Sequence, residues 1–201
     1  EQAPIPNVTK EIQDKIELLD TTTKDGMRIY IRGILYIMAK ALHEKYPEAL
    51  LSVNYQLSDA MFCKIDNMKV TEELIADVKK RMQEIINANI EIRKIIMNKE
   101  EAEKFYSSEK TKRGIAQIDN KQKESVSLYY CEDYYNYFFG VMPVSTGYTN
   151  IFDIITYKDG FLVRYPSRKN PTVLTPHKSN KKLLATLEEY EDIHKVLGVD
   201  T

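Results

Sequence analysis

Histidine and cysteine are the side chains that most often supply a base, a nucleophile or a metal ligand near neutral pH. The sequence has three histidines, in charge-rich helical or loop segments, and two cysteines: His43, His177, His194, Cys63 and Cys131. None of the spacings HxxxH, HExxH or CxxC, which gather metal ligands on one turn, occurs. This pattern favours surface histidines and reduced cysteines. The catalytic alternative that it leaves open is Cys131 acting with Asp133 or His43.

Loops that hold phosphate through backbone N–H groups need closely spaced glycines, and this chain of 201 residues has seven. Neither GxxxxGKS/T nor GxGxxG occurs. The net charge is −1, and acidic side chains dilute the lysine-rich stretch at 104–123, so a basic groove for nucleic acid is not indicated. The chain is therefore not predicted to bind a nucleoside triphosphate in the P-loop manner.

Aromatic side chains are concentrated in residues 129–143, YYCEDYYNYFFGVMP, with seven rings in the first eleven positions. Such a stretch fits a surface on which bases stack, a ligand pocket or a core strand. Glu132 and Asp133 lie among the rings and repel phosphate. A stacking platform for RNA is therefore less favoured than a small-ligand pocket or a core strand.

A mixture of helices and strands must position these side chains. Helices are predicted over residues 23–46, 71–87, 98–109 and 180–198, and strands over 16–20, 50–56, 60–65, 90–97, 125–132 and on both sides of Asp159-Gly160. The Asp-Gly pair is a strong hairpin signal. We therefore expect an α+β fold, in one large domain or one domain with an appendage.

Read in order, residues 24–166 resemble the editing domain of threonyl-tRNA synthetase, which is related to a domain of alanyl-tRNA synthetase. YIRGILYIMAKALHEKYPEA is similar to a family helix of the form IRHxxAHLLxxAxxxxYPxA, and LYYCEDYYNYFFGVMP to the motif LYxxExYxDxCRGPHxP. The resemblance implies a mixed or antiparallel sheet packed with a long helix and an N-terminal amphipathic helix, plus a C-terminal helix.

The departures from the family concern its catalytic positions. The family hydrolyses mischarged tRNA with two histidines one helical turn apart, a cysteine and a further histidine, and these places hold Gly33, Ile37, Phe138 and Met142. An aspartate near the cysteine is replaced by Asn136. No general base remains among these five side chains. The resemblance thus implies a relined pocket without catalytic or metal-binding residues: Gly33, Ile37, Asn136, Phe138, Phe139 and Met142.

A second resemblance, over residues 16–198, is to the N-terminal half of bacterial uridine-kinase-like nucleoside kinases of the phosphoribulokinase/uridine kinase family. TTKDGMRIY, YYCEDYYNYFFGVM, STGYTNIFDI and FLVRYP carry it. It implies a linker or arbitrary start at 1–15, the editing-like domain at 16–166, and a proline-rich loop and C-terminal helix at 167–201. These lead towards a kinase domain outside this chain. ATP and Mg²⁺ are expected only for that domain, and no cofactor for this fragment.

The resemblances predict a non-catalytic accessory, regulatory or ligand-binding domain of an ATP-dependent uridine kinase. Its expected partners are its own C-terminal kinase domain and a small ligand, a nucleoside or an amino acid, ranked ahead of tRNA. The alternative is a stand-alone or vestigial editing-like domain that binds tRNA or an aminoacyl group without metal. A purely structural domain, whose cleft has collapsed into core, fits the same residues.

No apolar run approaches the roughly 20 residues that span a bilayer, and the start EQAPIPNVTKEIQDK lacks the apolar core of a signal peptide. Hydrophobic residues make up 43% of the chain and charged residues 29%, an ordinary globular composition. We therefore expect a cytoplasmic protein with no membrane partner.

Overall fold

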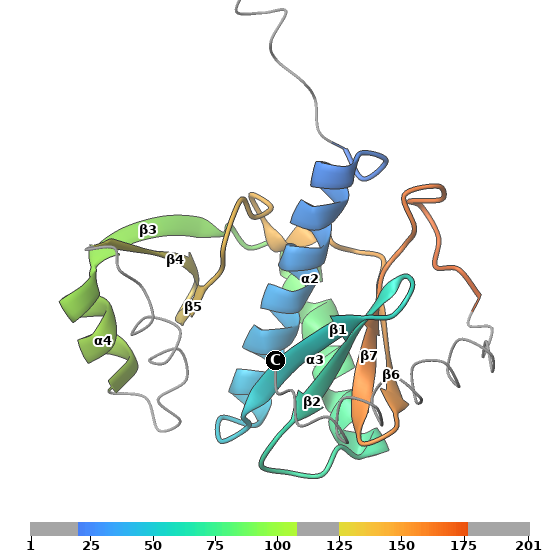
Figure 1. Cartoon of the computed structure of the whole chain (residues 1–201), viewed down its shortest axis with the longest axis horizontal. Helices are drawn as coiled ribbons and strands as arrows, with labels where there is room; N and C mark the ends of the chain where they lie inside the picture. The colour runs from blue at the N-terminus through green and yellow to red at the C-terminus, as the bar shows by residue number, and fades with distance from the viewer. Residues whose placement is uncertain (1–19, 108–124, 177–201) are drawn as a thin grey trace, which may run out of the picture.

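The computed structural model describes residues 20–107 and 125–176, and structural statements concern those residues (Figure 1). Its elements in chain order are α2 (Lys24–Lys45), β1 (Leu51–Gln56), β2 (Ala60–Ile65), α3 (Glu72–Ala88), β3 (Arg93–Asn98), α4 (Lys99–Ser107), β4 (Ser125–Cys131), β5 (Tyr134–Tyr137), the 3-10 turn η1 (Thr146–Tyr148), β6 (Asp153–Tyr157) and β7 (Gly160–Arg164). This mixture confirms the predicted α+β fold. The helix predicted at 180–198 and the strand predicted at 16–20, except for Asp20, lie outside the described residues.

The strands form two antiparallel sheets, ordered β1-β2-β7-β6 and β3-β4-β5. One face of the larger sheet packs with α2 and α3 in the main core. Helix α4 packs on the smaller sheet, where Ala102 contacts Val126 and Leu128. Figure 1 shows α2 between the two sheets, so this helix is the element that joins the two halves of the fold.

Helix α2 begins and ends where the sequence predicts. The Thr23 hydroxyl accepts a hydrogen bond from the Gly26 N–H at its start, and the Tyr46 N–H donates to the Leu42 carbonyl at its end. All residues from 33 to 42 are buried. A helix that is buried around its whole circumference must be covered on several sides, which agrees with its central position.

Helix α3 also begins at the predicted residue, because the Thr71 side chain accepts a hydrogen bond from the Leu74 N–H. It ends at Asn89, whose left-handed backbone, with φ of 49°, closes the last turn. A single apolar stripe packs in the main core with α2: Leu74, Ile75, Val78, Met82, Ile85 and Ile86.

The aromatic stretch is a hairpin, not the single tyrosine-rich strand expected from the sequence. β4 pairs with β5 so that Cys131 lies opposite Tyr134, and Glu132 adopts a left-handed φ of 57° in the turn between them. Tyrosines occur on both strands, and no glycine, proline or asparagine lies between Cys131 and Tyr134, so the sequence signals did not separate one strand from two. The predicted hairpin at Asp159-Gly160 is present and joins β6 to β7.

None of the described helices combines the length and the apolarity that a bilayer-spanning helix requires. The domain boundaries predicted after residues 15 and 166 stay predictions.

Candidate functional site

Gly33 lies where α2 contacts the loop that follows β5. A Cβ atom on Gly33 would stand 2.5 Å from Pro143 Cγ and 2.7 Å from Thr149 Cγ2. Nonbonded carbon atoms prefer separations of about 3.5–4.0 Å, so a side chain at this position must displace the loop. The loop therefore packs directly on the helix backbone, at the place where the editing family has its first histidine.

The other three family positions lie in the same packed region. Ile37 is fully buried in the main core, and Met142 is 6% exposed in a second cluster that also contains Tyr36. Phe138 is partly buried and packs against both clusters, with its ring edge-on to Tyr36 at 5.7 Å between centroids. We call the contact between α2 and residues 138–149 the motif junction.

The remaining two predicted pocket residues lie at the margin of the motif junction. Asn136 is partly exposed, and its side-chain amide donates a hydrogen bond to the Tyr134 hydroxyl at 2.9 Å. Phe139 is 79% exposed and contributes little to the interior. The structure thus gathers four of the six predicted residues in a packed interior and places Phe139 in solvent. Ligand binding by the six remains a prediction.

Hydrogen bonds across the motif junction fix the helix relative to the hairpin. The Tyr36 hydroxyl lies 3.1 Å from both the Tyr129 and the Tyr134 carbonyl oxygens and donates to this pair. The Tyr129 hydroxyl donates to the Gly140 carbonyl, and the Arg32 guanidinium to the Val141 carbonyl. Each of these bonds joins a tyrosine or arginine side chain to a backbone carbonyl. The hairpin and the loop after β5 are therefore held in place by side chains other than those at the family positions.

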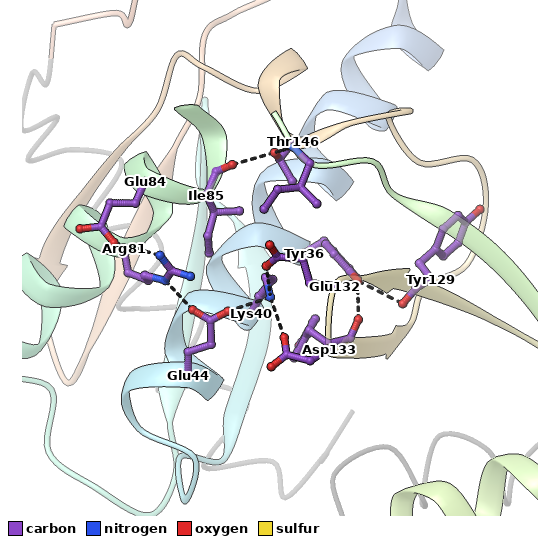
Figure 2. Close-up of polar contacts among 12 residues, drawn as sticks. Tyr36, Lys40, Glu44, Arg81, Glu84, Ile85, Tyr129, Glu132, Asp133 and Thr146 are labelled. Carbon is purple, nitrogen blue, oxygen red and sulfur yellow. Dashed lines mark hydrogen bonds and ion pairs between the residues drawn. The ribbon is translucent and has the colours of Figure 1, made fainter. Parts of the chain in front are cut away.

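Lys40 forms the principal charged contact between α2 and the β4–β5 turn, and this contact was not predicted from the sequence. Its side chain is fully buried, and its ammonium lies 2.7 Å from Glu44, 3.2 Å from Glu132 and 3.2 Å from Asp133. Figure 2 shows the ammonium between carboxylates from the helix and from the turn. The spacing of Lys40 and Glu44 signals an i,i+4 pair, but the two partners on the turn are more than 90 residues away in sequence.

Burial and mutual attraction shift the pKa values of Lys40, Glu44 and Asp133. Burial alone would lower the pKa of Lys40, but hydrogen bonds and attraction to Glu44, with hydrogen bonds to Asp133 and Glu132, raise it. Burial would raise the pKa of Glu44, but hydrogen bonds from Arg81 and Lys40 lower it. The hydrogen bond from Lys40 also lowers the pKa of Asp133. Lys40, Glu44 and Asp133 are therefore charged at neutral pH.

Carboxylates of Glu44, Glu132 and Asp133 approach within 4.8 Å of one another, the one such group of potential metal ligands among the described residues. The Lys40 ammonium already binds all three side chains, and Arg81 also pairs with Glu44. Positive charge is thus supplied by the protein itself. The cluster is best described as an internal ion-pair network.

Neither cysteine has the properties of a nucleophile. Cys63 and Cys131 are both fully buried. Burial raises the pKa of Cys63 to about 12, and that of Cys131 to about 11, where Lys40 offsets part of the rise. The His43 ring lies 5.6 Å from the Tyr134 ring. His177 and His194 lie outside the described residues.

These thiols are expected to resist alkylation in the folded protein. At pH 7 we expect Cys131 to react with iodoacetamide at least about a hundredfold more slowly than an unhindered cysteine, because little thiolate forms and burial blocks access. Mass spectrometry of timed samples measures the rate, and the urea-unfolded protein is the control. Rapid labelling of folded protein would contradict the structure and reopen Cys131 as a nucleophile.

Four exposed apolar side chains lie in residues 139–148, within the segment that contributes to the motif junction. Phe139, Val141, Val144 and Tyr148 are 79%, 62%, 65% and 66% exposed. Arg32 donates to the Val141 carbonyl and has no carboxylate within 4.0 Å among the described residues. We call these five residues the junction patch. Large exposed apolar groups in one segment commonly mark a binding surface.

The four family positions at the motif junction supply no general base. They present a glycine, two apolar side chains and a buried thioether, and the nearby hydroxyls of Tyr36 and Tyr129 are engaged in hydrogen bonds. Hydrolysis of an ester needs a base or a metal-bound water. The described side chains of the junction contribute apolar packing and hydrogen bonds to the backbone.

Comparisons with known proteins find similarity to threonine–tRNA ligases. No family model matches the chain. It is 32% identical over 152 residues to a probable cytoplasmic threonine–tRNA ligase of Enterocytozoon bieneusi, covering 74% of this chain and 24% of the relative. It is also 26% identical over 172 residues to the threonine–tRNA ligase of Thermoplasma volcanium, covering 83% and 26%. For the Ligilactobacillus salivarius ligase the identity is 27% over 144 residues, covering 70% and 22%.

The chain spans about a quarter of the length of the curated relatives that it matches most fully. These relatives do not bear on a nucleoside-kinase parent, which stays a prediction from the sequence. The comparisons and the α+β fold together confirm the resemblance to threonyl-tRNA synthetase: the chain contains a threonyl-tRNA synthetase-like domain.

Proposed function

We propose that this domain is a vestigial editing-type domain that binds the acceptor end of tRNA and does not hydrolyse an aminoacyl ester. The observation that carries the proposal is the packing at Gly33, where Pro143 and Thr149 occupy the space that a histidine side chain would need. The editing positions come together in space, yet they form a closed apolar interior.

The junction patch is the surface proposed to contact RNA. Bases stack on exposed aromatic side chains regardless of sequence, and Phe139 and Tyr148 supply two such rings. Arg32 supplies a positive charge for a phosphate. The acidic Glu132 and Asp133 are paired with Lys40 and lie at the other end of β5, so they oppose this contact less than the sequence indicates.

Two pairs of substitutions test the contact. Phe139→Ser is expected to weaken tRNA binding about tenfold, because stacking of one base contributes about 1–3 kcal/mol. Ile96→Ser is its matched control, since Ile96 is 67% exposed on β3, outside the patch. Arg32→Gln is expected to weaken binding, whereas Arg28→Gln, one turn earlier on α2, leaves it unchanged.

Fluorescence anisotropy with labelled tRNA at fixed salt measures these affinities, and tRNA that lacks its 3′-terminal nucleotides is the second ligand. The proposal predicts that truncated tRNA binds more weakly than intact tRNA. It also predicts that the loss of binding free energy from truncation and the loss from Phe139→Ser are not additive. An equal loss of tRNA affinity in the patch variants and in their controls, or no binding of intact tRNA, would contradict the proposal.

A further inference from the structure

The face of the larger sheet that is turned away from α2 and α3 carries an apolar row across all four strands. Tyr55 on β1 lies opposite Phe62 on β2, Phe62 opposite Leu162 on β7, and Leu162 opposite Ile155 on β6. We call these four residues the outer ladder. An antiparallel sheet with one solvated face normally carries polar side chains there.

The centre of the outer ladder is buried. Phe62 is 1% exposed and Leu162 is 2% exposed. The cluster around them consists of strand and turn residues, and among the described residues no helix contributes to it: Ala60, Phe62 and Leu162, with Tyr55, Leu57, Ile155 and Tyr157 at its margin. The aromatic rings of Tyr55 and Tyr157 lie 5.0 Å and 5.7 Å from the Phe62 ring.

Ion pairs lie on both sides of the outer ladder, which we also call the apolar strip. Lys64 pairs with Asp159 at 2.8 Å on one side, and Arg164 pairs with Asp153 at 3.6 Å on the other. A bounded apolar strip with a charged rim is suited to the apolar face of an amphipathic helix.

The described chain ends beside this strip. After β7, the Thr175 carbonyl accepts a hydrogen bond from the Arg164 guanidinium, and the Thr175 hydroxyl donates to Asp59 at 3.4 Å. Asp59 directly precedes β2, and Arg164 lies opposite Ala60 in the row next to the outer ladder. The other end of the described chain, Asp20, lies at the start of α2 and hydrogen-bonds to Thr22 and Thr23. It contributes nothing to the outer cluster.

The sequence that follows Thr175 carries a matching apolar stripe. Leu183, Leu187, Tyr190 and Leu197 recur at spacings of four, three and seven residues, while Glu189 and Asp192 fall elsewhere. Five residues separate Thr175 from position 181, enough to reach the strip when extended. Of the two terminal segments outside the described residues, the C-terminal one therefore has both the composition and the position to cover the outer ladder.

We propose that residues 181–197 form an amphipathic helix that packs its leucine stripe across the outer ladder. The helix completes a three-layer arrangement, with α2 and α3 on the inner face of the sheet and the C-terminal helix on the outer face. This interaction surface is independent of the proposed function, because it lies on the opposite side of the sheet from α2.

Site-specific photo-crosslinking in the full chain tests the proposal. Benzoylphenylalanine replaces Leu187 in one variant and Leu183 in a second, so that a folding defect at one site leaves the other informative. Glu189 is the control site, because it lies about 200° around the helix from Leu187. After irradiation, peptide mass spectrometry maps the residues that are joined.

The proposal predicts intramolecular crosslinks from positions 183 and 187 to the peptides that contain Tyr55–Phe62 or Ile155–Leu162, at least about fivefold above those from position 189. Equal yields from all three positions would overturn it. So would crosslinks to other regions, or a covalent dimer that increases with protein concentration, which would assign the strip to a second copy.

Discussion

Replacing Gly33 with histidine, the residue of the editing family, is expected to destabilise the domain by about 3 kcal/mol and to restore no hydrolysis. The reason is overpacking, because even a Cβ atom would stand 2.5 Å from Pro143 Cγ. Gly33→Ala should cost less, about 1–2 kcal/mol, since alanine favours a helix by roughly 1 kcal/mol over glycine. Urea denaturation monitored by circular dichroism measures both changes.

The matched control is Arg28→His on the exposed side of the same helix, which should change the free energy of unfolding by less than about 0.5 kcal/mol. Shortening the contacting residue provides a second check. If Gly33 and Pro143 touch as described, Gly33→Ala together with Pro143→Ala should cost less than the two single changes added. Simple additivity would show that the loop does not pack on the helix at this point.

Replacing Lys40 with methionine is expected to destabilise the domain by about 2 kcal/mol at pH 7. Methionine keeps most of the buried volume, so the loss reports on charge. Removing one partner of a buried ion pair costs about 3–5 kcal/mol, but Glu132 and Asp133 are 49% and 88% exposed and remain solvated, which reduces the effect. Lys45→Met on the exposed side of α2 is the control and should be nearly neutral.

The pH dependence separates this charge effect from a packing defect. The ion pairs with Lys40 lower the folded-state pKa values of Asp133 and Glu44. The stability that these pairs contribute is therefore fully present above the unfolded-state pKa values, near about pH 4, and is lost as the pH falls through the folded-state pKa values. The pKa of Lys40 is raised, so its contribution is lost only as pH rises through its folded value, above about 10.

The difference between wild type and Lys40→Met should therefore stay constant from about pH 6 to 9 and shrink below about pH 4. Thermal melts across this range measure it. A difference that is the same at pH 3 and pH 7 would show that methionine disturbs packing and that the ion pairs contribute little.

The helices were predictable from local signals. Thr71 and Asn89 enclose one clean apolar stripe in α3, and no other part of the chain is needed to place its ends. The β6–β7 hairpin follows from Asp159-Gly160 in the same way. The β4–β5 hairpin was missed because its turn, Glu132-Asp133, lacks the glycine or asparagine that usually signals a left-handed residue.

The motif positions were predictable only through resemblance to a family. The resemblance implied that Gly33 and Phe138 stand in place of catalytic residues, which stays a prediction, but it could not show whether the cleft stays open. That depends on Pro143 and Thr149 reaching the helix backbone, a contact set by tertiary packing. The Lys40 network was missed for the same reason, since its partners lie on a turn distant in sequence.

The proposed replacement of catalytic groups by apolar side chains is also expected to stabilise the fold. An editing cleft must leave room for substrate and water, and apolar cavities cost stability in proportion to their volume. In this chain Ile37 and Met142 are buried among other apolar side chains. Under the proposed function, packing of this interior replaces a catalytic cleft, and the exposed junction patch is the surface that would contact tRNA.

The central claim is that the domain binds an aminoacyl-tRNA without hydrolysing it, and one single-turnover experiment tests both halves. A tRNA carrying a radiolabelled aminoacyl ester is mixed with saturating protein, and binding and ester hydrolysis are followed in the same samples. We predict saturable binding with hydrolysis no faster than in buffer. A general base accelerates hydrolysis by about 10²–10⁴-fold, so acceleration beyond about tenfold, or the absence of binding, would contradict the claim.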